Sequence, residues 1–170
     1  MITFQLGELN SMPNPKFLDG FKDPNDKQAA EALIAWANRN GLMFRPGDGT
    51  VRLVEYVVVP EAKYEQGTSG EPLLTLQQPV AKGQWDIPFG RMKGIALGDK
   101  TAKRRLFDML NAVLPAQYQL PEKALELGEN GRTWGQLPYP ALHDGTILAD
   151  FCGVLALAQR AAIAGAPLGK

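Results

Sequence analysis

Cysteine, histidine and serine are scarce in this chain, and their scarcity excludes several kinds of chemistry. The 170 residues include one cysteine, Cys152, and one histidine, His143, so neither an internal disulfide nor the usual zinc site can form. The only serines, Ser11 and Ser69, stand in loop-like segments without a catalytic motif around them. Oxygen ligands alone could in principle hold Mg²⁺ or Ca²⁺. No residue pattern points to such a site, so we predict neither a metal nor a cofactor.

An excess of charge of either sign is also missing. The chain has 18 basic and 18 acidic residues, which gives a formal net charge of zero. The whole molecule therefore has no bulk attraction for polyanions, and a nucleic-acid-binding role would require a local basic patch.

The sequence gives no sign of a targeting or membrane segment. Residues 1–12 have no basic region followed by an apolar run, so we expect no signal peptide and a cytoplasmic location. The longest apolar run, 147–163, is interrupted by Asp150, Gln159 and Arg160. Because a membrane span needs about 20 predominantly apolar residues, we expect this run to be a buried or interface helix and not a membrane span.

An apolar fraction of 45%, with 13 prolines and 18 glycines, is typical of a globular protein with many turns. We predict one compact domain over 1–170 in the α+β class, with three main helices on a small, mostly antiparallel sheet and long irregular loops. The periodicity and the capping residues place the helices at about 24–39, 100–114 and 146–164. Strands are expected at 1–9, 50–59 and 73–76, with one or two helical turns at 121–127.

The last predicted helix carries apolar residues on nearly every side, and many of them are small. Such a helix is either central in its own domain or covered by a partner, and the small side chains allow another helix to approach closely. Both alternatives, burial within the domain and an oligomer or partner interface, remain open from the sequence.

The segment 82–105 is unusually basic for a chain without net charge. It contains seven basic and two acidic residues, which gives a local net charge of +5. These residues are our candidate anion- or partner-binding group: Lys82, Arg91, Lys93, Lys100, Lys103, Arg104 and Arg105. Four of them stand at the start of the predicted helix 100–114, where the helix dipole disfavours cations but where backbone N–H groups favour a bound anion. The alternative is a solvated face whose charge is balanced by nearby acids such as Glu122, Glu126 and Glu129.

Two proline-rich segments carry large aromatic residues. We name Trp85, Phe89, Trp134 and Tyr139 as candidate partner-binding aromatics. Aromatic side chains in a backbone fixed by prolines can anchor an interface at low entropic cost, or they can fill the ends of a small core. The sequence does not separate these roles.

Catalytic chemistry has little support. His143 and Cys152 are the only possible nucleophile–base pair, with Asp144 as an orienting group, but Cys152 stands among apolar helical residues typical of a buried thiol. Asp23 resembles the first residue of a calcium loop only superficially, and it is better explained as the N-cap of the helix that begins at Pro24.

The sequence therefore favours a non-enzymatic interaction or assembly protein, of the kind found among accessory or structural components of viruses and mobile elements. Its partner would be another protein or a second copy in a homo-oligomer. The first alternative is a phosphate- or nucleic-acid-binding module centred on the basic helix start at 100–105. A weaker alternative is a small hydrolase-like enzyme that uses carboxylates and His143.

Overall fold

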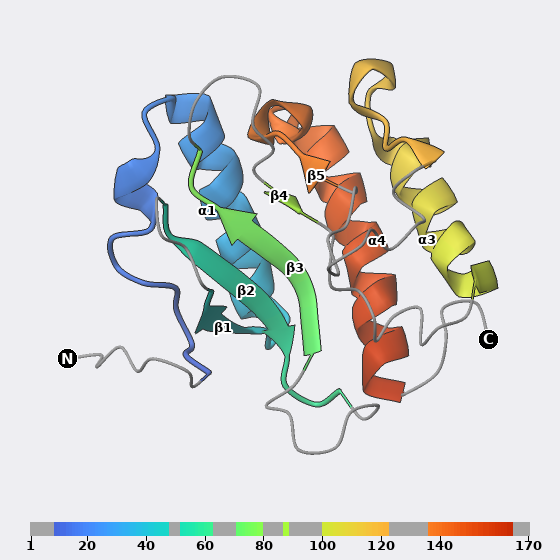
Figure 1. Ribbon diagram of the computed structural model, residues 1–170, viewed down its shortest axis with the longest axis horizontal. Coiled ribbons are helices and arrows are strands. Elements are labelled where there is room, and N and C mark those ends of the chain that lie inside the picture. The colour runs from blue at the N-terminus through green and yellow to red at the C-terminus, as the bar shows by residue number, and fades with distance from the viewer. Residues whose placement is uncertain are drawn as a thin grey trace.

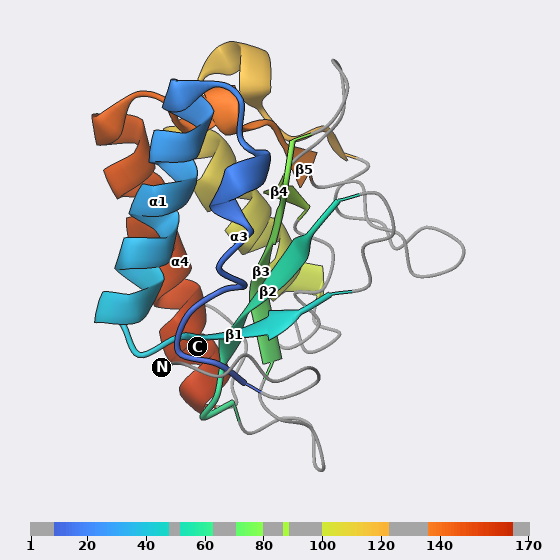
Figure 2. The ribbon, with the colours of Figure 1, turned by 90° about the vertical axis from the view of Figure 1, so that its left-hand side faces the viewer.

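A layer of helices covers one face of a small antiparallel sheet. Figures 1 and 2 show this arrangement in a computed structural model of the protein. The model describes residues 9–47, 52–62, 71–79, 87–88, 100–122 and 136–164, and the observations below concern these ranges. Their architecture is α+β, as the sequence predicts, whereas the single domain over 1–170 stays a prediction.

The three main helices begin and end close to their expected positions. They are α1 (Pro24–Arg39), α3 (Lys100–Val113) and α4 (Gly145–Ala164). At the start of α1, the Asp23 carboxylate accepts hydrogen bonds from the backbone N–H groups of Asn25 and Asp26, at 2.7 and 3.2 Å. Asp144 does the same for Thr146 and Ile147 at the start of α4. Both helices thus begin at an N-cap aspartate, which explains why their starts could be predicted.

The main sheet has three strands in the order β1 (Met43–Pro46), β2 (Val54–Val59) and β3 (Glu71–Gln77), paired antiparallel throughout. The sequence predicted the second and third of these strands but not β1, which is short and follows α1 almost directly. A register shift between Val57 and Val58 interrupts the ladder to β3. A second, two-stranded pair joins β4 (Ile87–Pro88) and β5 (Gln136–Leu137), and β4 contacts β3.

Several expected elements are changed or lie outside the described residues. The strand expected at 50–59 begins at Val54 instead, and residues 52–53 precede it without strand pairing. Of the strand expected at 1–9, only Leu9 is described and it is not in a strand, although Asn10 makes an isolated bridge with Phe44. The helical turns expected at 121–127 lie outside the described residues beyond Glu122.

The core lies between the two layers, with α4 in the middle of the helical layer. α4 contacts α1 on one side, α3 on the other, and the strands β2 and β3 beneath it. Its buried side consists of Phe151, Cys152, Val154, Leu155, Ala158, Gln159 and Ala162. By length and hydropathy α4 also meets the criteria for a helix that could cross a membrane, a property that it shares with core helices of globular proteins. This side of α4 agrees with the first of the two alternatives, burial within the domain.

Candidate functional site

The basic start of α3 was the strongest functional signal in the sequence, and the structure describes part of it. Arg104 and Arg105 are exposed on α3. Lys100 and Lys103 belong to the same helix, but their side chains lie outside what the structure describes. The remaining candidates of this group, Lys82, Arg91 and Lys93, fall outside the described residues altogether.

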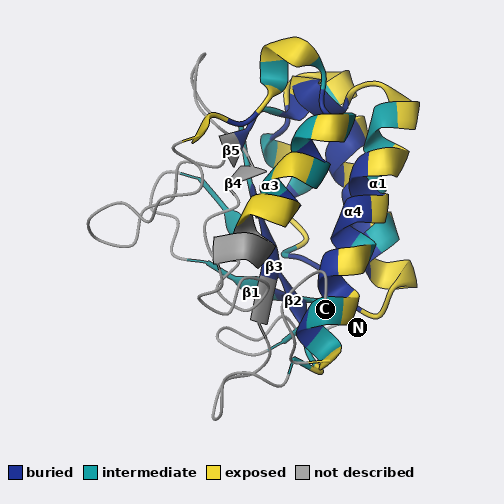
Figure 3. Cartoon of the chain, turned by 90° about the vertical axis from the view of Figure 1, so that its right-hand side faces the viewer, coloured by how far each residue is buried: buried dark blue, intermediate teal, exposed yellow. Residues whose placement is uncertain are grey.

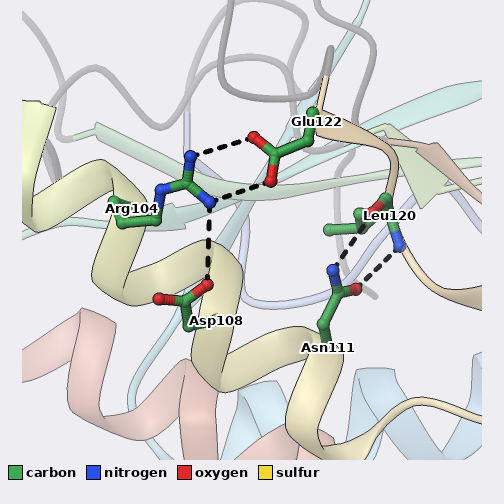
Figure 4. Close-up of polar contacts among 5 residues, drawn as sticks. All are labelled: Arg104, Asp108, Asn111, Leu120 and Glu122. Carbon is green, nitrogen blue, oxygen red and sulfur yellow. Dashed lines mark hydrogen bonds and ion pairs between the residues drawn. The ribbon is translucent and has the colours of Figure 1, made fainter.

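Arg104 is already engaged by its own chain (Figure 4). Its two terminal nitrogens donate hydrogen bonds to the two carboxylate oxygens of Glu122, at 3.0 and 2.9 Å. The same guanidinium lies 4.0 Å from an Asp108 oxygen and over the Phe107 ring. Hydrogen bonding to Glu122 raises the pKa of Arg104, and hydrogen bonding to Arg104 lowers the pKa of Glu122. The charge of Arg104 is therefore compensated within the chain, and Glu122 is one of the balancing acids that the alternative interpretation named.

Asn111, two helical turns after Arg104, holds the same returning segment (Figure 4). Its side-chain amide donates to the carbonyl oxygen of Leu120 at 3.1 Å and accepts from the Leu120 N–H at 2.7 Å. Gln119 also donates to the backbone oxygen of Asn111 at 3.1 Å. Arg104 and Asn111 thus fasten residues 119–122 against α3. Arg105 makes no ion pair with the described part of the chain, so within the basic group it is the described side chain whose charge is not compensated there.

Of the four aromatic candidates, only Tyr139 is described, and it is a core residue. It has 0% exposure and packs edge-to-face against Phe21, with ring centroids 5.0 Å apart. Its hydroxyl donates to the backbone oxygen of Gln77 at 2.8 Å. Because it has no exposed surface, Tyr139 fills the core and does not itself contact a partner. Trp85, Phe89 and Trp134 lie outside the described residues.

The residues considered for catalysis serve structural roles in the described part of the protein. Cys152 is buried, and burial raises the pKa of its thiol to about 11, against a smaller lowering by Arg39. The thiol is therefore neutral at physiological pH, whereas nucleophilic catalysis needs the thiolate. The His143 ring bonds to the Asp26 carboxylate at 2.6 Å, and Asp144 caps α4.

Asp23, Asp26 and His143 form a small cluster that the sequence analysis missed. Their side-chain ligand atoms all lie within 4.8 Å of one another. Asp26 and His143 are 117 residues apart in the sequence, so no local pattern could reveal their contact. The Asp23 carboxylate is occupied as the cap of α1, and Asp26 is occupied by His143, so we interpret the cluster as a link between the starts of α1 and α4.

Glu55 on β2 is an acidic residue at a buried position of the sheet. It is only 1% exposed, and it pairs across the sheet with Leu76 of β3, which is fully buried. One carboxylate oxygen accepts from the Asn14 N–H at 2.6 Å, while the other has no hydrogen-bond partner among the described residues. Burial raises the pKa of Glu55 to about 7, and the hydrogen bond from Asn14 opposes this shift.

Glu55 and Gln78 together hold the segment before α1 against the sheet. The Gln78 side chain accepts from the Leu53 N–H at 2.8 Å and donates to the Phe17 carbonyl at 2.8 Å. With the bond from Asn14 to Glu55, these contacts connect the loop before α1 to the sheet. The position of Glu55 therefore has a structural explanation.

The side of α4 that faces away from the sheet is exposed between α1 and α3 (Figure 3). We define the α4 outer face by its exposed residues: Thr146, Ala149, Asp150, Gly153, Leu157, Arg160 and Ala164. At 100° per residue these positions fall within an arc of about 100°, so they form one continuous surface. Leu157 is 37% exposed, and an added Cβ on Gly153 would meet nothing within 4 Å.

Comparisons of the chain with protein-family models, with curated proteins and with solved structures find no match. The function is therefore inferred from the residues themselves.

Proposed function

We propose that this protein is a non-enzymatic interaction and assembly protein whose binding surface is the α4 outer face. The observation that carries the proposal is a long apolar helix that packs against its neighbours on three sides and leaves the fourth exposed. α4 is buried against α1, α3 and the sheet, yet its opposite side exposes Ala149, Gly153 and Leu157 to solvent. Leu157 stands among small residues on this face, so another helix can approach it closely.

The composition of the surface supports the same conclusion. Gly153 stands in the interior of a helix, where glycine costs about 0.5–1 kcal/mol relative to alanine. Nothing within the described chain requires its lack of a side chain, because the space around it is open. A glycine that lowers stability without serving the packing of its own chain is consistent with a close approach by another molecule.

Two substitutions on the surface test the proposal. We expect Leu157→Asp and Gly153→Arg to abolish the association of the protein with its partner, measured by pull-down from the native source and by light scattering. Lys22→Glu, at an exposed position before α1, is the matched control and should bind as the wild type does. Unchanged association in both surface variants, with folding confirmed by circular dichroism, would contradict the proposal.

The second candidate is an anion- or nucleic-acid-binding module, and it is favoured by one observation, the exposed Arg105 without an ion pair to a described residue. Arg104 and Arg105 form a matched pair for its test. Because the charge of Arg104 is compensated by Glu122, Arg105→Ala should weaken binding to mixed DNA more than Arg104→Ala does, and should reduce its salt dependence. Absence of binding at low salt would exclude this candidate.

A further inference from the structure

We infer that the partner of the α4 outer face is a second copy of this chain, bound through an antiparallel α4–α4 contact about a two-fold axis. This inference depends on the proposed function, because it names the occupant of the same surface. It is derived from the order of charged, small and large residues along the face.

Two opposite charges stand symmetrically on the face. Asp150 and Arg160 are both exposed, and neither forms an ion pair with another described residue. They are ten positions apart, which is about 15 Å along a helix. Their midpoint is Leu155. A two-fold axis perpendicular to α4 at the level of Leu155 therefore brings Asp150 level with Arg160 of the second copy, and Arg160 level with Asp150 of the second copy.

A glycine and an exposed leucine share the same midpoint. Gly153, which has open space where a side chain would stand, and Leu157, the exposed leucine of the face, are also centred on Leu155. The same axis brings Leu157 of the second copy level with Gly153. A glycine opposite a leucine lets the two helices approach closely and removes the leucine from water.

The rest of the face contains nothing that opposes this arrangement. The axis places Thr146 level with Ala164 of the second copy, and Ala149 level with Ala161 of the second copy, a half-buried residue beside the face. All four side chains are small. A contact between identical surfaces must be self-complementary about its axis, and the order of the charges and of the glycine and leucine along α4 satisfies that condition. The long arginine side chain can span the lateral offset between Asp150 and Arg160 across the contact.

A parallel contact lacks these features. With the two helices parallel and in register, Asp150 would face Asp150 of the second copy and Arg160 would face Arg160, and like charges repel. The sequence of the face thus specifies the direction of the second helix. Because one helix pair buries less area than the 1,200 Å² or so typical of stable interfaces, we expect a weak dimer that dissociates on dilution.

Charge reversal provides the test, measured by sedimentation equilibrium over a concentration series that reaches about 1 mM, where weak dimers are populated. We expect Asp150→Arg and Arg160→Asp each to weaken self-association at least about tenfold, because each places like charges opposite one another. The double variant with both reversals should restore it to within about threefold of the wild type. A wild type that stays monomeric, or a double variant as weak as the single ones, would overturn the inference.

A second variant tests the shape complementarity. Gly153→Leu places a large side chain opposite Leu157 of the second copy but favours the helix, so it should remain folded and yet lose self-association. Gly153→Leu that dimerises as the wild type does would also overturn the inference. If the wild type is monomeric while Leu157→Asp still abolishes capture of another protein, the second copy is the wrong partner and the proposed function stands. If Leu157→Asp changes neither self-association nor the capture of another protein, both the inference and the proposed function fail.

Discussion

The guanidinium of Arg104 and the carboxylate of Glu122 form a two-point ion pair that closes the segment after α3 back onto the helix. The pair is exposed, so it adds little to global stability, since exposed ion pairs are weak. Its effect is local. It fixes the position of residues 119–122 together with Asn111.

Loss of the ion pair should therefore loosen the segment without unfolding the protein. We expect Arg104→Ala and Glu122→Gln to increase amide hydrogen exchange in residues 115–122 and to leave the melting temperature nearly unchanged. Arg105→Ala is the matched control, because it removes a neighbouring exposed charge that has no described ion-pair partner. Equal exchange in all three variants would show that the pair does not hold the segment.

Asn111 should contribute more to the global stability of the protein than Arg104 does. Its amide satisfies both backbone groups of Leu120, and Leu120 is buried. Replacing it with alanine removes two hydrogen bonds, and we expect the free energy of unfolding in urea to fall by about 1–2 kcal/mol. Asn111→Asp should be at least as damaging, because its second oxygen would face the Leu120 carbonyl. Gln117→Ala, at an exposed site on the same segment, should have little effect.

The elements that the sequence revealed are those with local signals. α1 was predicted correctly from Pro24 to Arg39 because an aspartate cap, a proline at the first position and a regular apolar face all lie within the helix and its ends. The strand β1 was missed because its four residues, Met43–Pro46, have no clear alternation and include a proline. Their pairing with Val58 to Glu55 depends on contacts distant in the sequence.

The candidate sites, too, could be predicted only where they depend on residues close together in the sequence. The basic cluster at 100–105 is a local pattern that the sequence shows directly. The neutralisation of Arg104, in contrast, depends on a carboxylate 18 residues away. The Asp26–His143 contact spans 117 residues and had no signal in the sequence. The small residues of α4 could be seen in advance, whereas the side of the helix that stays exposed could be read only from its packing.

Gly153 should lower the stability of the isolated chain. We expect Gly153→Ala to raise the free energy of unfolding by about 0.5–1 kcal/mol, because alanine restricts the unfolded backbone and the added methyl meets no neighbour. Urea unfolding at low protein concentration measures this. Gly145→Ala, at the first position of α4 and also in open space, is the comparison and should give a smaller gain. A destabilising Gly153→Ala would mean that the glycine is required by its own fold.

Cys152 should behave as an inert core thiol. With its pKa raised to about 11 by burial, we expect labelling by a disulfide reagent at about pH 8 to be far slower in the native protein than in urea. The control is Leu157→Cys in a Cys152→Ala background, which places a thiol on the exposed side of the same helix and should react rapidly. Rapid labelling of native Cys152 would reopen the question of a nucleophilic role.

Glu55 should make the stability of the protein depend on pH. Its pKa is about 7 in the folded chain and 4.5 as the ordinary value, so the folded state binds the extra proton between these two pH values. Stability from this group is therefore fully present below about pH 4.5, falls as the pH rises toward 7 and is constant above it. The cause is burial, which removes the carboxylate from solvent and so disfavours its charged form.

Glu55→Gln isolates this effect, because the amide oxygen can still accept from the Asn14 N–H but the side chain does not ionise. Relative to the wild type, the variant should gain about 1–3 kcal/mol in its free energy of unfolding between about pH 5 and about pH 8, since each pKa unit corresponds to about 1.4 kcal/mol. Urea titrations at a series of pH values measure the difference. Glu31→Gln, at an exposed position on α1, is the control and should follow the wild type at every pH. If Glu55→Gln also runs parallel to the wild type, the carboxyl does not titrate in this range and its unpaired oxygen must be solvated.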